Sequence, residues 1–141
     1  MPKTWSFHSA GVLIRDGKIL LGRKTGGEEY ALPGGNIELG ESTRESLVRE
    51  YSRKTGASVS CGRLLWIEES VECEEESSLN FYYMVELSED AGEGFFAQDA
   101  DTLYDWLPIE KIGSVKTYPE FLGNEITKLE KYPKHFKSNY C

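Results

Sequence analysis

Residues 34–57 read GGNIELGESTRESLVREYSRKTGA and decide the fold. Within this stretch Ser42 and Glu45 form a capping box, in which the Ser hydroxyl accepts from the first helical turn and the Glu side chain accepts from the Ser amide. Apolar residues from Leu47 to Tyr51 recur at helical spacing, and Gly56 is a typical C-terminal stop. The stretch therefore predicts a tight glycine turn, a loop and one capped helix that ends before Gly56.

The sequence on both sides of this helix predicts strands and further short helices. Asp16-Gly17 is a hairpin signal between two β-like runs, and Pro-Gly-Gly at 33–35 allows positive φ and close backbone approach. The order favours hairpins and separate helices over a βαβαβ alternation. We expect strands at 5–14, 18–23, 57–69, 80–87 and 102–107, a short helix at 108–112 and a longer one at 119–131.

The spacing of the polar residues closely resembles the Nudix box of the MutT-like pyrophosphohydrolases. Gly35, five residues, Glu41, seven residues and Arg49-Glu50 stand in that order, with Gly56 six residues further on. The preceding run 30–35, Tyr-Ala-Leu-Pro-Gly-Gly, looks like the family's lead-in. The resemblance covers roughly residues 5–130 and implies a Nudix fold of the α/β (α+β) class, a mixed β-sheet sandwiched between helices. It also implies a single domain over 1–141, with a core at 5–130 and a C-terminal tail at 132–141.

The resemblance implies a diphosphate hydrolase that uses Mg²⁺ or Mn²⁺. Hard cations prefer several carboxylate oxygens, and the metal polarises the phosphate and activates water. Carried over by position, the catalytic residues are Glu50, Arg49 and Glu41. Of these, Glu50 and Glu41 would hold the metal. The phosphate-binding candidates are Arg23, Gly34, Gly35, Arg53 and Lys54.

The chain departs from the box at its most consequential place, because Arg53-Lys54 stands where the family has Glu-Glu. Both cations lie within ion-pair reach of Glu50 on a helix, at i+3 and i+4. A carboxylate flanked by two cations is a poor metal ligand. The cofactor is therefore Mg²⁺ or Mn²⁺ if the protein is active, and none if it is not.

Several of these residues have a structural interpretation beside the functional one. Glu41 lies next to a helix N-terminus, which favours negative charge without any metal, and Glu45 is explained by the capping box. Backbone geometry alone demands glycine at 34, 35 and 56. Candidates for a replacement ligand are Glu68, Glu69, Glu72 and Glu74–Glu76, and aromatic residues that could stack on a base or fill the core are Tyr30, Trp66, Phe81 and Tyr83.

Three functions fit these observations. The first is a Nudix pyrophosphohydrolase that acts on a nucleoside diphosphate linked to another moiety through an impaired or shifted metal site. The second is a Nudix domain that binds a nucleotide or phosphorylated ligand without cutting it. The third is a protein-interaction module whose acidic strand region pairs with a second copy as a homodimer. Fold alone does not choose among them.

Composition and charge limit the partners. The net charge is −8, and residues 64–110 hold 14 acidic residues with no Lys or Arg. Nucleic acid and anionic membranes both require positive potential, so neither is an expected partner. No apolar run approaches the ~20 residues of a membrane helix, and the N-terminal residues lack a signal pattern. The expected partner is a small nucleotide or diphosphate, and the expected location is cytoplasmic.

Overall fold

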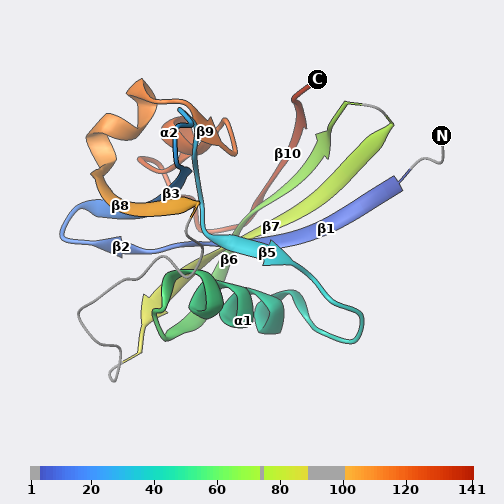
Figure 1. Ribbon diagram of the computed structural model, residues 1–141, viewed down its shortest axis with the longest axis horizontal. Coiled ribbons are helices and arrows are strands. Elements are labelled where there is room, and N and C mark those ends of the chain that lie inside the picture. The colour runs from blue at the N-terminus through green and yellow to red at the C-terminus, as the bar shows by residue number, and fades with distance from the viewer. Residues whose placement is uncertain (1–3, 74, 89–100) are drawn as a thin grey trace.

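Among the residues that the structure describes, two five-stranded mixed sheets form the framework (Figure 1). The structure, a computed structural model, describes residues 4–73, 75–88 and 101–141. Sheet A has the strand order β10 (Lys134–Asn139), β6 (Val59–Val71), β7 (Glu76–Leu87), β1 (Thr4–Val12) and β5 (Gly34–Asn36). Sheet B has the order β2 (Ile14–Arg15), β3 (Lys18–Lys24), β4 (Tyr30–Ala31) and β9 (Thr117–Tyr118), with β8 (Thr102–Pro108) paired to β3. The expected α+β class with a mixed sheet is confirmed.

The two faces of sheet A are covered by different layers. Helix α1 (Thr43–Thr55) lies along one face, and the 3-10 helix η1 (Ile109–Ser114) and the single-turn helix α2 (Leu122–Glu125) pack on the other, while sheet B contributes side chains to the clusters on both sides (Figure 1). Consecutive strand residues point to opposite faces. Tyr82 therefore joins the core cluster with Trp66 and Ile112, while Tyr83 joins the cluster under α1 with Leu47 and Tyr51.

The helix that carries the box begins and ends as its sequence predicts. The Ser42 Oγ accepts from the Glu45 amide at 3.0 Å, and Glu45 Oε1 accepts from the Ser42 amide at 3.2 Å. Gly56 takes a left-handed conformation with φ 76° and donates to the Ser52 carbonyl. The hairpin turn at Asp16-Gly17 is confirmed too, with both residues at positive φ. Such local signals fix their elements without help from the rest of the chain.

Two expectations for the C-terminal quarter were wrong. Residues 119–131 form only the four-residue α2, in which Gly123 packs so closely against Gly113 that no side chain would fit between them. Residues 132–141 were expected to be a tail, yet they contain β10, which pairs in parallel with β6 from Lys134↔Trp66 to Asn139↔Val71. β10 is a mostly polar edge strand, so it lacks the hydrophobic signal by which strands are predicted.

In the described part of the chain, no helix combines the length and the apolar character needed to cross a bilayer.

Candidate functional site

The first part of the site is an ion pair that ties the loop before α1 to the helix itself. Arg49 Nε donates to Glu41 Oε2 at 2.7 Å, and Arg49 Nη2 donates to Glu41 Oε1 at 2.9 Å. The same Nη2 donates to the Asn36 carbonyl at 3.1 Å, and the Glu38 amide donates to Glu41 Oε1 at 3.0 Å. This two-pronged geometry is the strong form of an Arg–carboxylate contact. Both oxygens of Glu41 are therefore engaged.

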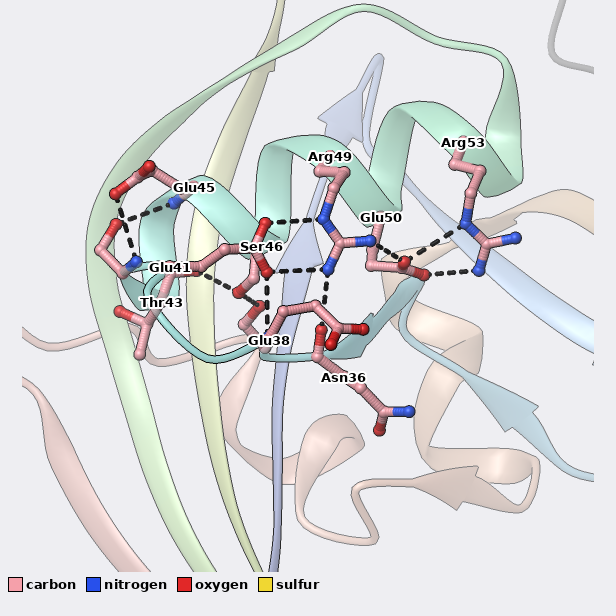
Figure 2. Close-up of polar contacts among 11 residues, drawn as sticks. Asn36, Glu38, Glu41, Thr43, Glu45, Ser46, Arg49, Glu50 and Arg53 are labelled. Atoms are coloured by element: carbon pink, nitrogen blue, oxygen red, sulfur yellow. Dashed lines mark hydrogen bonds and ion pairs between the residues drawn. The ribbon is translucent and has the colours of Figure 1, made fainter.

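The second part is Glu50, a carboxylate surrounded by three cations, of which Figure 2 shows Arg49 and Arg53. Its side chain is only 8% exposed. Glu50 Oε1 accepts from Arg49 Nη1 and, at 3.2 Å, from Arg53 Nε, while Oε2 accepts from Arg53 Nη2 at 2.7 Å. Lys54 Nζ lies 3.9 Å from Oε2. The expected pairing of Glu50 with Arg53 and Lys54 is what the structure contains.

The protonation of this cluster follows from its contacts. Burial alone would raise the pKa of Glu50, but hydrogen bonds from Arg53 and Arg49 outweigh burial and hold that pKa below its ordinary value. The hydrogen bond from Arg49, followed by that from the Glu38 amide, lowers the pKa of Glu41. Both carboxylates are therefore ionised at neutral pH and neutralised by their arginines.

Close backbone approach explains the two glycines that precede the helix. Gly34 and Gly35 lie in β5 and pair with β1, and neither has positive φ, so that part of the expectation was wrong. A Cβ at Gly34 would collide with the Ser9 carbonyl, and one at Gly35 would collide with the Glu50 carboxylate. The glycines let β5 lie directly against β1 and against the buried Glu50.

The donor set at α1 does not fit a divalent metal. Mg²⁺ requires several oxygen ligands in a nearly octahedral arrangement, and the carboxylates of Glu41 and Glu50 already accept from Arg49 and Arg53. Among the described residues, no group of three or more His, Cys, Asp and Glu side chains is placed to hold a metal ion. A cation at Glu50 would have to displace the guanidinium of Arg53.

The acidic residues considered as replacement ligands make other contacts. Glu68 is completely buried and accepts from Asn80, Tyr82 and Tyr140. Glu69 pairs with His135, and Glu72 accepts from Tyr118 and from Ser70. Glu75 and Glu76 are exposed, and Glu74 lies outside the described residues.

Two cavities flank the lead-in to the helix, and Lys54 lines both. The first, about 360 Å³, lies between β3, the loop before β4 and β8, with Gly22, Glu28 and Tyr104 in its wall. The second, about 260 Å³, lies between β1, β7 and β9, with His8, Tyr82 and Tyr118 in its wall. Leu32 and Gly34 also line both. Arg53 lines neither, so within the Arg-Lys pair Lys54 is the one placed toward a ligand.

Arg23 and the aromatic candidates have mainly structural contacts. Arg23 Nη1 donates to the Gly27 carbonyl at 2.9 Å, and its guanidinium lies over the Tyr30 ring. Trp66 packs edge-on against Tyr82 and Phe121 in the core. Neither Arg23 nor any of the four aromatic candidates lines the two cavities.

Comparison with known proteins identifies the family to which this fold belongs. A family model described as NUDIX domain matches residues 6–128. The chain belongs to the Nudix family. A MutT protein from Bacillus halodurans has a TM-score of 0.74 at 17% identity, over 94% of this chain and 90% of that one. An ADP-ribose pyrophosphatase from Streptococcus suis 89-1591 has a TM-score of 0.63 at 17% identity, over 93% and 98%. At such identities the two structures support the shared Nudix fold alone.

A curated Nudix relative covers the box region more narrowly. The uncharacterized Nudix hydrolase YvcI of Bacillus subtilis (strain 168) is 47% identical over 45 residues, which are 32% of this chain and 28% of that protein. The chain thus aligns with little more than a quarter of that relative's length. The likeness supports the Nudix assignment and leaves the substrate to be inferred from the site.

Sequence reasoning identified Gly34, Gly35 and Lys54 of the second cavity but missed its residues His8, Asn80, Tyr82 and Tyr118. His8 and Asn80 are 72 positions apart, and they meet because β1 and β7 are paired in parallel at this register. A sequence signal did exist for Asn80, a polar residue within a β-like run, and Glu68 was considered only as a replacement metal ligand. The partners of these two residues could be identified only from the strand order of this Nudix domain.

Proposed function

We propose that this Nudix domain binds a nucleoside diphosphate derivative without a metal and that its metal-dependent hydrolysis is strongly impaired. One observation carries the proposal: both oxygens of Glu50 accept hydrogen bonds from arginines. By resemblance to the Nudix box, Glu residues of this helix would otherwise bind the metal. The intact frame of Gly35, Glu41, Arg49 and Glu50 supports the alternative, a hydrolase with a shifted metal site.

The position of Lys54 supports a diphosphate as the central part of the ligand. Its ammonium is a compact point charge suited to phosphate oxygens, and its side chain lines the cavities on both sides of Leu32 and Gly34. Small-molecule sites usually measure about 300 to 1,000 Å³. Each cavity is at or below the lower part of that range, so a ligand with two bulky parts joined by a diphosphate fits better than one large ring system.

The proposal is tested by separating binding from turnover. ADP and ADP-ribose are titrated by calorimetry at low salt in EDTA, and the same compounds are then incubated with Mg²⁺ or Mn²⁺ and analysed for products. We expect binding in EDTA that weakens as salt screens the contact, and at most trace turnover.

Lys54→Met tests the role assigned to the lysine. Loss of a charge-assisted contact should weaken binding roughly tenfold, whereas Lys111→Met, at an exposed lysine of η1, should bind as the wild type does. Absence of binding in EDTA would refute the metal-free site. Metal-dependent turnover that Glu50→Gln abolishes would establish the hydrolase instead.

A further inference from the structure

A chain of buried hydrogen bonds leads from Glu68 on β6 to His8 on β1. Glu68 Oε1 accepts from Asn80 Nδ2 at 3.0 Å and from Tyr82 Oη at 2.9 Å, and Glu68 Oε2 accepts from Tyr140 Oη at 2.6 Å. Asn80 Oδ1 lies 3.0 Å from His8 Nδ1. Glu68 is completely buried and Asn80 is 2% exposed, so water does not substitute for these partners.

The orientation of the Asn80 amide is determined by two acceptors on one side of it. One is the Glu68 carboxylate. The other is the Tyr118 hydroxyl, 3.3 Å from Asn80 Nδ2, which gives its own proton to Glu72 Oε1 at 3.2 Å and therefore accepts from Asn80. Both acceptors need a donor, and in the Asn80 side chain only the amide NH₂ group donates. The carbonyl oxygen of Asn80 must then point to His8.

This orientation selects one tautomer of His8. A carbonyl oxygen accepts and does not donate, so the hydrogen between His8 and Asn80 must be on Nδ1. In the neutral ring Nε2 then has no hydrogen and is an acceptor. In the described part of the chain, the structure gives Nε2 no hydrogen-bond partner.

His8 lies in the wall of the 260 Å³ cavity, together with Ala10, Leu32, Tyr82 and Tyr118. The wall is thus largely apolar and aromatic, as suits a flat ring. The Tyr82 and Tyr118 hydroxyls both give their protons to carboxylates. Lys54 lines the same cavity, which places the phosphate side of a ligand at that side chain.

We propose that His8 is a specificity-determining residue that accepts a hydrogen bond from an amino group on the ligand's base, and that Asn80 and Glu68 position it for this role. The inference rests on the proposed function, since it assumes that a nucleoside diphosphate enters this cavity. An exocyclic amino group extends beyond the ring edge and carries the hydrogen that Nε2 lacks. A carbonyl at the same place, as in uracil, would face the nitrogen lone pair and be rejected.

The tautomer can be measured without any ligand. Long-range ¹H–¹⁵N correlation spectra distinguish protonated from unprotonated imidazole nitrogens. The chain has two histidines, so His135→Gln, which changes an exposed residue of β10, leaves His8 as the sole signal. We expect Nδ1 protonated and Nε2 unprotonated. In Asn80→Leu, which removes the orienting carbonyl, we expect a mixture of tautomers. A predominant Nε2–H form in the His135→Gln protein would overturn the proposal.

Recognition is measured with nucleotides that differ by one amino group. The pairs are ADP with purine riboside 5′-diphosphate, GDP with IDP and CDP with UDP, all titrated in EDTA at low salt. For the tightest-binding pair, the amino-bearing member should bind about threefold to tenfold more tightly, the range of one neutral hydrogen bond. In His8→Phe, which keeps a ring and removes the acceptor, the ratio should fall to about one.

The outcomes separate this inference from the proposed function. If no diphosphate binds in EDTA, the proposed function fails and the role of His8 fails with it. If diphosphates bind but the paired nucleotides bind equally, or if His8→Phe keeps the discrimination, only the role of His8 is refuted. Discrimination that His8→Phe abolishes and Asn80→Leu reduces would establish His8 as the residue that recognises the base and Asn80 as its positioning residue.

Discussion

At the scale of single residues, Glu50 is the buried centre of a cluster of ion pairs on α1. Its neighbours Arg49, Arg53 and Lys54 are 38%, 62% and 35% exposed, so each cation keeps part of its hydration while the carboxylate does not. Ion pairs with exposed partners stabilise weakly, but a buried carboxylate without partners would be costly. Glu50 therefore depends on its arginines more than they depend on it.

Acid should remove this stabilisation. The folded-state pKa of Glu50 is lowered, so its contribution is complete above the unfolded pKa of about 4.3 and is lost as the pH falls through the lower folded value. Glu50→Gln should destabilise the fold by about 1 to 3 kcal/mol at pH 7, and by less at pH 3. Urea unfolding at both pH values measures this. Glu86→Gln, at an exposed carboxylate of β7, is the control. Equal destabilisation at both pH values would contradict the ion-pair account.

Restoring the family pattern should restore metal binding. Arg53→Glu combined with Lys54→Glu removes two of the three cations around Glu50 and supplies two carboxylates on the same helix. We expect Mn²⁺ uptake by the double variant in calorimetry and none by the wild type. Arg15→Glu with Lys18→Glu makes the same charge change in the β2–β3 hairpin and should bind no metal. Failure of the first variant to bind would mean that the frame has diverged beyond these two positions.

At the scale of elements, β10 is held to sheet A by more than its strand pairing. Tyr140, directly after the strand, donates to the buried Glu68 and accepts from the Glu120 amide at 3.1 Å. Lys134, the first residue of β10, donates to the buried Glu125 at 2.8 Å. The C-terminal strand thus provides partners for two buried carboxylates, one on β6 and one on α2.

Tyr140→Phe tests this attachment. The substitution removes the donor to Glu68 Oε2 and leaves a buried oxygen unpaired, which should cost about 1 to 3 kcal/mol of folding free energy. Tyr132→Phe, at a side chain that is 72% exposed, should change stability by less than about 0.5 kcal/mol. Urea unfolding at pH 7 gives both values. A Tyr140→Phe protein as stable as the wild type would show that Glu68 does not need this partner.

The distance along the chain between contacting residues explains which features the sequence could predict. The capping box at Ser42, the turn at Asp16-Gly17 and the stop at Gly56 each depend on neighbours within four residues, and all three were predicted correctly. The ion pairs of Glu50 were predictable because helix geometry fixes i+3 and i+4. By contrast, the contacts His8–Asn80 and Glu68–Tyr140 each span 72 positions and depend on strand order, which no local pattern encodes.

At the scale of the whole molecule, the two cavities lie where the layers meet. The larger is lined by sheet B and by Lys54 of α1, and the smaller by sheet A, by Tyr118 of β9 and by the same lysine. A ligand that fills both therefore contacts α1 and both sheets, which are the layers that separate when the protein unfolds. Binding at such a place must stabilise the folded state as a whole, because the unfolded chain has no such site.

This linkage gives a measurable shift in melting temperature. A ligand present at 100 times its dissociation constant stabilises by about 2.7 kcal/mol, and a domain of this size gains roughly 2 to 4 °C per kcal/mol. We therefore expect a nucleoside diphosphate that binds in EDTA to raise the melting temperature by roughly 5 to 10 °C. For Lys54→Met the shift is measured from the melting temperature of the ligand-free variant, because the lysine also lies 3.9 Å from Glu50 and its loss can change stability by itself. At the same ligand concentration the variant should lose most of the shift. A shift that appears only with added Mg²⁺ would refute the metal-free site, and one that Lys54→Met retains in full would place the diphosphate elsewhere on the molecule.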